Sequence, residues 1–185
     1  MTDIIPPVFE EFPKIPRLRR DCIITEKLDG TNSQVVVPED GGPLLVGSRN
    51  RWIAPGKTTD NFGFAQWVAD HEAEIRSLGF GRHFGEWWGA GIQRRYGLAE
   101  KRWSLFNTTR WSAPDVKLPS CIGLVPVLYQ GPFTDGAVEA ALTRLRDSGS
   151  VAAPGFMQPE GVVVFLAASR QLYKVTIGDD GHKGA

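Results

Sequence analysis

The chain has 185 residues, 42% of them hydrophobic and 23% charged, which is ordinary for a soluble globular protein with a sizeable core. Lysine plus arginine and aspartate plus glutamate number 21 each, so the net charge argues against a passive nucleic-acid coat protein and leaves a local basic patch open. No segment has the length of a membrane span or the pattern of a signal peptide, so a cytoplasmic protein is the default expectation. Cys22 and Cys121 lie in separate apolar runs and are expected as buried free thiols.

The predicted elements begin after an N-terminal arm, because residues 1–20 are rich in proline and then in arginine, which predicts an extended segment. Apolar patterning predicts strands at 22–27, 33–38 and 43–48, with Asp-Gly-Gly-Pro at 40–43 as the turn between the last two. Residues 61–78 predict an amphipathic helix, stopped by Gly79, whose apolar stripe comprises Phe64, Trp67, Val68, Ile75 and Leu78.

The second half of the chain is predicted to contain five strands and one helix. Further strands are predicted at 82–88, 102–107, 122–129, 160–166 and 171–177. A second helix is predicted at 135–147, with Val138, Ala141, Leu142 and Leu145 on its stripe and Gly149 after it. Strands outnumber helices and do not alternate strictly with them, which predicts an α+β fold on antiparallel sheets instead of a doubly wound parallel sheet. The chain has no low-complexity linker, so one domain over residues 1–185 is expected.

The segment 26–32, Glu-Lys-Leu-Asp-Gly-Thr-Asn, places Lys27 at the end of an apolar strand, just before an Asp-Gly turn. Partial burial of a lysine and nearby cations favour its neutral amine, which is a nucleophile. Taken alone, the same spacing suits an ordinary strand end followed by a turn.

Six short motifs in this order resemble the nucleotidyltransferase motifs of the superfamily of covalent ligases and capping enzymes. They are Lys27-x-Asp29-Gly30-Thr31-Asn32, Ser48-Arg49, Phe84-Gly85-Glu86-Trp87, residues 102–107 (Arg-Trp-Ser-Leu-Phe-Asn), residues 160–164 (Glu-Gly-Val-Val-Val) and Tyr173-Lys174-Val175. The first motif is similar to that of ATP-dependent RNA ligases that seal nicked duplex RNA. The resemblance, from about residue 14 to residue 177, implies an antiparallel-sheet nucleotidyltransferase fold, the ATP-grasp-like ligase adenylation domain with flanking helices.

The resemblance implies that Lys27 attacks the ATP α-phosphate and carries AMP, with Asp29, Glu160 and Lys174 as the other catalytic residues. Glu160 is implied as the ligand of Mg²⁺ (or Mn²⁺), a cation that prefers oxygen ligands. The implied nucleotide-binding residues are Glu26, Lys27, Asn32, Arg49 (phosphate or ribose), Glu86 (ribose hydroxyl), Phe106 (stacked on adenine), Val162 (under adenine) and Lys174 (phosphate). Arg49 and Lys174 also fit plain surface charges, Glu86 a solvent-facing strand position, and Phe106 core packing.

The sequence departs from the family pattern at two positions. Thr176 stands where many members have the second lysine of Lys-x-Lys, so His182, Lys183 or an arginine elsewhere is expected to replace that cation, or the attack on ATP to be slower. Asp29 stands where nick-sealing RNA ligases commonly have histidine.

Only eight residues follow Ile177, so no C-terminal oligonucleotide-binding or helical domain is expected. RNA would then be held by basic clusters of this chain or by a separate nucleic-acid-binding partner. Arg17, Arg19 and Arg20, and Arg94-Arg95-Tyr96 with Lys101-Arg102, are the candidates, and solvated loops are their equal alternative.

The leading hypothesis is an ATP-dependent RNA ligase that joins a 3′-hydroxyl to a 5′-phosphate through lysyl-AMP and AMP-capped RNA. A DNA ligase or a GTP-using capping enzyme would use the same lysine chemistry. A degenerate domain that binds nucleotide or RNA ends without ligase activity is the third alternative.

Overall fold

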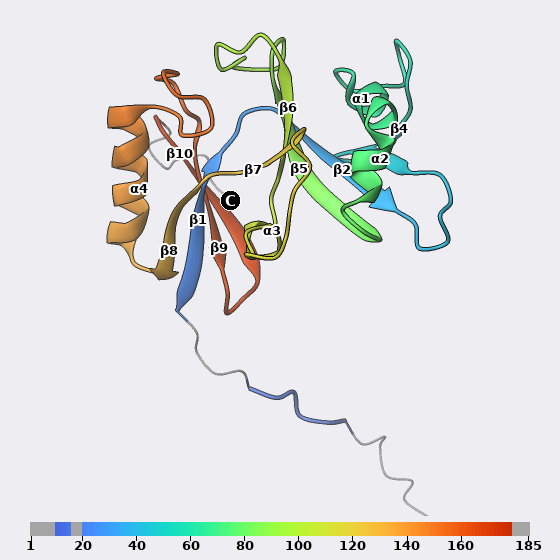
Figure 1. Cartoon of the computed structure of the whole chain (residues 1–185). Helices are drawn as coiled ribbons and strands as arrows, with labels where there is room; N and C mark the ends of the chain where they lie inside the picture. The colour runs from blue at the N-terminus through green and yellow to red at the C-terminus, as the bar shows by residue number, and fades with distance from the viewer. Residues whose placement is uncertain (1–9, 16–19, 179–185) are drawn as a thin grey trace, which may run out of the picture.

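The computed structural model describes residues 10–15 and 20–178, which fold as two sheets with four helices (Figure 1). The four-stranded sheet has the order β10 (Gln171–Thr176), β9 (Gly161–Leu166), β1 (Asp21–Lys27), β8 (Val127–Pro132). The six-stranded sheet has the order β4 (Trp52–Ile53), β3 (Leu45–Ser48), β2 (Thr31–Val37), β5 (Gly81–Gly89), β6 (Lys101–Leu105), β7 (Ile122–Leu124). The helices are α1 (Phe64–Asp70), α2 (Glu72–Arg76), α3 (Thr108–Trp111) and α4 (Asp135–Ser148).

Helix α4 covers one face of the four-stranded sheet (Figure 1). Its N-terminus is capped by the Thr134 side chain, which accepts a hydrogen bond from the Ala137 amide at 3.0 Å. Its C-terminus ends at Gly149, whose φ of 77° favours glycine and where a Cβ would lie 2.6 Å from the Phe156 carbonyl oxygen. The buried cluster between helix and sheet contains Cys22, Ile24, Ala141, Leu142, Leu145, Val162 and Val164.

Tryptophans dominate the core between the six-stranded sheet and helices α1 and α2. Trp87 and Trp103 are buried there with Phe64, Val68 and Ile75. The Trp103 indole donates to Ser33 Oγ at 2.9 Å, so its buried N–H has a partner. Within the described residues, no helix is long and apolar enough to cross a membrane.

A third buried cluster includes Leu28, which lies in the segment that connects β1 of one sheet to β2 of the other. It consists of Trp88 from β5 and of residues from the segments between elements: Leu28, Tyr96, Val125 and Ala153. The motif segment 27–30 is therefore anchored by the buried side chain of Leu28.

The predicted α+β class is confirmed, and the strand pairs are antiparallel except for β6 with β7, which is parallel. The predicted strand 122–129 is wrong as one element, because it divides at Pro126 into β7 of one sheet and β8 of the other. Proline cannot donate to a ladder, and here its carbonyl instead accepts from the Glu26 amide at 2.9 Å.

The predicted helix 61–78 is also wrong as one element. It begins only at Phe64, after Phe62 and Gly63 with positive φ of 52° and 78°, and it breaks at His71. The His71 ring nitrogen Nδ1 contacts the Trp67 carbonyl oxygen at 2.8 Å, a local bond that competes with helix continuation. Strand β4 and helix α3 were too short to leave a periodic pattern.

The N-terminal arm predicted for residues 1–20 is described only at residues 10–15 and 20, which form no helix or strand. Residues 1–9 and 16–19, with Arg17 and Arg19, lie outside the described part, as do His182 and Lys183.

Candidate active site

A cavity of about 980 Å³ lies between the two sheets and is lined by both. Its lining residues include Thr25, Lys27, Val163, Phe165 and Lys174 from the four-stranded sheet and Asn32, Arg82, Phe84 and Glu86 from the six-stranded sheet. Arg49, Phe106 and Arg110 add to it from loops and from α3. The volume is at the upper end of the usual range for small-molecule sites.

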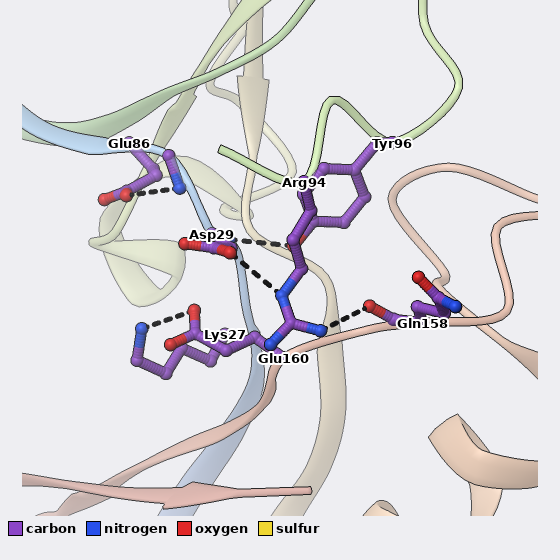
Figure 2. A network of polar contacts seen from close by, with 8 residues as sticks. Lys27, Asp29, Glu86, Arg94, Tyr96, Gln158 and Glu160 are labelled. Carbon is purple, nitrogen blue, oxygen red and sulfur yellow. Dashed lines mark hydrogen bonds and ion pairs between the residues drawn. The ribbon is translucent and has the colours of Figure 1, made fainter. Parts of the chain in front are cut away.

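Lys27 faces this cavity because side chains alternate along β1. Cys22, Ile24 and Glu26 are buried on the α4 side, whereas Thr25 and Lys27 lie on the cavity side. Lys27 Nζ lies 2.6 Å from Glu160 Oε2, the residue just before β9 (Figure 2). Their side chains are only 24% and 17% exposed, so the ion pair is partly shielded from water.

Three residues hold the Asp29-Gly30 turn by hydrogen bonds: Tyr96, Arg94 and Glu86 (Figure 2). The Asp29 amide donates to the Tyr96 hydroxyl at 2.8 Å, and Asp29 Oδ2 accepts from Arg94 Nε at 2.8 Å. Arg94 also donates through Nη1 to the Gln158 carbonyl oxygen at 3.0 Å. A Cβ at Gly30 would lie 2.4 Å from the Trp87 carbonyl oxygen, so glycine alone allows this close approach.

The loop that supplies Arg94 and Tyr96 is strained. Gln93, Arg95 and Tyr96 have positive φ values of 42°, 61° and 52°, a region that side chains with a Cβ rarely adopt. Burial raises the pKa of Tyr96, and its hydroxyl accepts the hydrogen bond from the Asp29 amide. The strain is therefore concentrated in a loop that positions the turn after Lys27.

Glu86 lies on β5, directly opposite Asn32 on β2, and both line the cavity. Burial raises the pKa of Glu86 to about 7, and the nearby carboxylates of Glu160 and Asp29 act in the same direction. The Gly30 amide, 3.0 Å from Glu86 Oε1, and the Lys27 ammonium oppose the rise and are outweighed. A carboxylate with this perturbation in a cleft is typical of a functional site.

Lys174 lies on β10 and faces the same cavity. In the ladders, Thr25, Val163 and Lys174 form one row across β1, β9 and β10. Lys27, Gly161 and Thr176 form a neighbouring row. Thr176, the departure from Lys-x-Lys, thus occupies the strand position in line with Lys27.

The prediction that Val162 faces the nucleotide is wrong. Val162 is fully buried against α4, and Val163, one residue along, lines the cavity instead. Side chains on a strand alternate between its faces, so a shift of one residue changes the face. The all-apolar run 161–166 carries no alternation that would have revealed this.

Glu26 is among the residues that line the cavity, but its carboxylate is engaged elsewhere. Its carboxylate is 1% exposed and accepts from the Ser150 hydroxyl and from the amides of Val151 (2.8 Å) and Ala152 (3.0 Å). It therefore ties β1 to the loop that follows α4, which is a structural role that the sequence did not indicate.

The remaining predicted residues divide by location. Asn32, Arg49 and Phe106 line the cavity together with Lys27. Arg94 and Tyr96 are engaged with Asp29, so they do not form the free RNA-binding cluster that was predicted. Lys101 donates to the Phe62 carbonyl oxygen, and Arg102 pairs with Glu100.

The glycines at 89, 91 and 97 that surround Arg94 and Tyr96 are the sequence signal that could have identified this loop as close to the site. In the described residues, no group of three or more histidine, cysteine, aspartate or glutamate side chains could hold a metal ion by itself.

The sequence model of the RNA ligase family matches residues 20–176. The chain belongs to this family. Solved structures with the same fold include a variant of the Naegleria gruberi RNA ligase with AMP and Mn, at TM-score 0.62 and 19% identity over 85% of this chain and 49% of that one. Another variant of that ligase, with ATP and Mn, has TM-score 0.58 and 17% identity over 85% of this chain and 50% of that one.

At such identities the likeness shows the fold alone, and this RNA ligase family member spans about half the length of those structures. No curated protein sequence matches it.

Proposed function

We propose that the chain is an ATP-dependent RNA ligase that joins 3′-hydroxyl and 5′-phosphate RNA ends through a covalent lysyl-AMP intermediate. The observation that carries the proposal is Lys27, whose Nζ faces a nucleotide-sized cavity and lies 2.6 Å from Glu160. The structures of the Naegleria enzyme with ATP or AMP and Mn, together with the family match, support ATP and a divalent cation as the cofactors.

The cavity lining fits the parts of ATP. Phe106 offers an exposed ring for the adenine, and Val163 offers an apolar surface in place of Val162. Glu86 and Asn32, side by side on neighbouring strands, suit the ribose hydroxyls. Arg49 and Lys174 supply positive charge for the phosphates.

In the first step, the Lys27 amine attacks the α-phosphorus of ATP after losing a proton. A P–N bond forms, the P–O bond to the β-phosphate breaks, and pyrophosphate leaves. The RNA 5′-phosphate next displaces the lysine and takes the AMP. The 3′-hydroxyl of the other end then attacks that 5′-phosphate, closes the phosphodiester and releases AMP.

Glu160 is the residue that would hold Mg²⁺ or Mn²⁺, with the ATP phosphates as further ligands, since magnesium needs only one or two carboxylates when substrate phosphates are present. The cation would supply charge neutralisation on the phosphate oxygens. Before ATP and the cation bind, the ion pair with Glu160 keeps Lys27 aimed into the cavity.

The test is incubation with ATP labelled at the α-phosphate and a divalent cation, with GTP in parallel. We expect an acid-labile covalent label from ATP, absent in Lys27→Ala and retained in the matched control Lys57→Ala, an exposed lysine outside the cavity. A label that persists in Lys27→Ala would refute the assignment of the nucleophile. Preferential labelling by GTP would indicate a capping enzyme, and ATP binding without any label a degenerate binding domain.

Strand sealing is tested separately, because the chain corresponds to about half of its solved relatives. We expect pre-adenylated protein to join RNA ends with release of AMP. Sealing of nicked DNA alone would assign the chain as a DNA ligase.

A further inference from the structure

Two exposed aromatic rings and an arginine lie on the open face of the six-stranded sheet, outside the chemistry described above. Trp52 on β4 is 53% exposed and Phe84 on β5 is 46% exposed. The guanidinium carbon of Arg82 lies 5.6 Å from the Trp52 ring centroid and 5.9 Å from the Phe84 ring centroid. We call Trp52, Arg82 and Phe84 the aromatic strip.

The strand register explains the strip. Trp52, Gly47, Gln34 and Phe84 are successive partners across β4, β3, β2 and β5, which are neighbours in the six-stranded sheet. Gly47 has no side chain, which leaves room for the Gln34 side chain to lie over it: a Cβ at Gly47 would be 2.9 Å from Gln34 Cγ. Gln34 Oε1 accepts a hydrogen bond from Arg82 Nη1, which holds the guanidinium between the two rings.

The strip continues into the cavity. Arg82, Phe84 and Phe106 all line it, and the Phe106 amide donates to the Phe84 carbonyl oxygen at 3.0 Å. Phe84 and Glu86 are two residues apart on β5 and share one face. A nucleic-acid strand whose end occupies the cavity would therefore pass over the aromatic strip.

The charge of this region suits a polyanion. Neither Arg49 nor Arg82 makes an ion pair within the described residues, although both line the cavity next to the strip. Exposed rings that alternate with arginine stack on unpaired bases and contact phosphates. In a duplex the bases already stack on one another and are not available to such rings.

We propose that the aromatic strip binds unpaired nucleotides of the RNA end whose terminus enters the cavity, so that the chain prefers single-stranded ends to a fully paired nick. This inference rests on the proposed function for its substrate class, and it adds the binding surface and the strand preference.

The test compares Trp52→Ala with Trp52→Phe, because Trp52 does not line the cavity. Affinity is measured by fluorescence anisotropy with a short labelled single-stranded RNA and with a blunt RNA duplex. We expect Trp52→Ala to weaken single-strand binding about fivefold or more, Trp52→Phe to restore most of it, and duplex binding to stay unchanged. Arg82→Gln should reduce the salt dependence of binding by about one counterion.

Phe80→Ala is the matched control, since Phe80 is 66% exposed and lies outside the cavity and the strip. Equal single-strand affinities of Trp52→Ala and the wild type would overturn the proposal, and this is the result expected if the strip instead serves a protein partner. Wild-type binding that is no tighter to single strands than to duplex would overturn it too.

Self-adenylation is measured on the same samples. It should be unchanged in Trp52→Ala, and its loss there would mean a damaged fold, in which case Trp52→Phe decides through its RNA affinity. A wild-type protein that never adenylates but binds single strands through Trp52 would refute the proposed ligase and leave the strip intact.

Discussion

Replacement of Glu86 by glutamine should change how the stability of this protein depends on pH. Glutamine keeps the oxygen that accepts the Gly30 amide and removes the titrating proton. The substitution therefore removes the free-energy cost of ionising this buried carboxyl and keeps the hydrogen bond that it accepts.

The magnitude follows from linkage. The pKa of Glu86 rises from an ordinary 4.5 to about 7 in the folded chain, mainly through burial. The folded state then holds the proton more tightly than the unfolded state, so the favourable contribution is complete below pH 4.5 and is lost as pH rises to about 7. A difference of about 2.5 pH units corresponds to about 3 kcal/mol at roughly 1.4 kcal/mol per unit.

Urea unfolding of both proteins between pH 4.5 and pH 8, without nucleotide, measures the effect. Near pH 4.5 the two should be about equally stable, which is the internal control. At pH 8, Glu86→Gln should be more stable by up to about 3 kcal/mol. Parallel pH profiles of the wild type and the variant would refute the reasoning, because Glu86 would then titrate alike in both states.

Four further substitutions test the positions of other side chains. Glu26→Ala leaves several buried donors unpaired and should lower the free energy of unfolding in urea by about 3 kcal/mol; a loss under about 0.5 kcal/mol would contradict the buried role. Val162→Ala should lower the free energy of unfolding by about 1–3 kcal/mol and leave ATP affinity unchanged. Val163→Ala should weaken ATP binding in a titration. The reverse pattern would contradict the observed register. Arg94→Gln frees the Asp29 carboxylate and should slow the rate of self-adenylation more than it changes KM for ATP, so a change in KM alone would count against this positioning role.

Much of the site was predictable because the motifs are local. Lys27 and Asn32 come from one motif, and Arg49, Glu86, Phe106 and Lys174 come from four others. The structure places all six residues around one cavity. The interactions of the loop at residues 89–97 were not predictable, because its arginine and tyrosine look like any basic cluster until Asp29 is seen beside them.

The sequence by itself determined the strand that carries Lys27, the α4 stripe and the order of the motifs, because each depends on the periodicity or identity of neighbouring residues. Tertiary structure alone decided that Pro126 sends one apolar run into two sheets and that Glu160, 133 residues from Lys27, pairs with it. It also decided that Val163 and not Val162 faces the cavity. The Glu26 carboxylate, in the same way, is hydrogen-bonded to the loop after α4. These outcomes depend on pairing register and on which face of a strand is covered. Both are set by contacts between distant segments, and a run of apolar residues reads the same in either register.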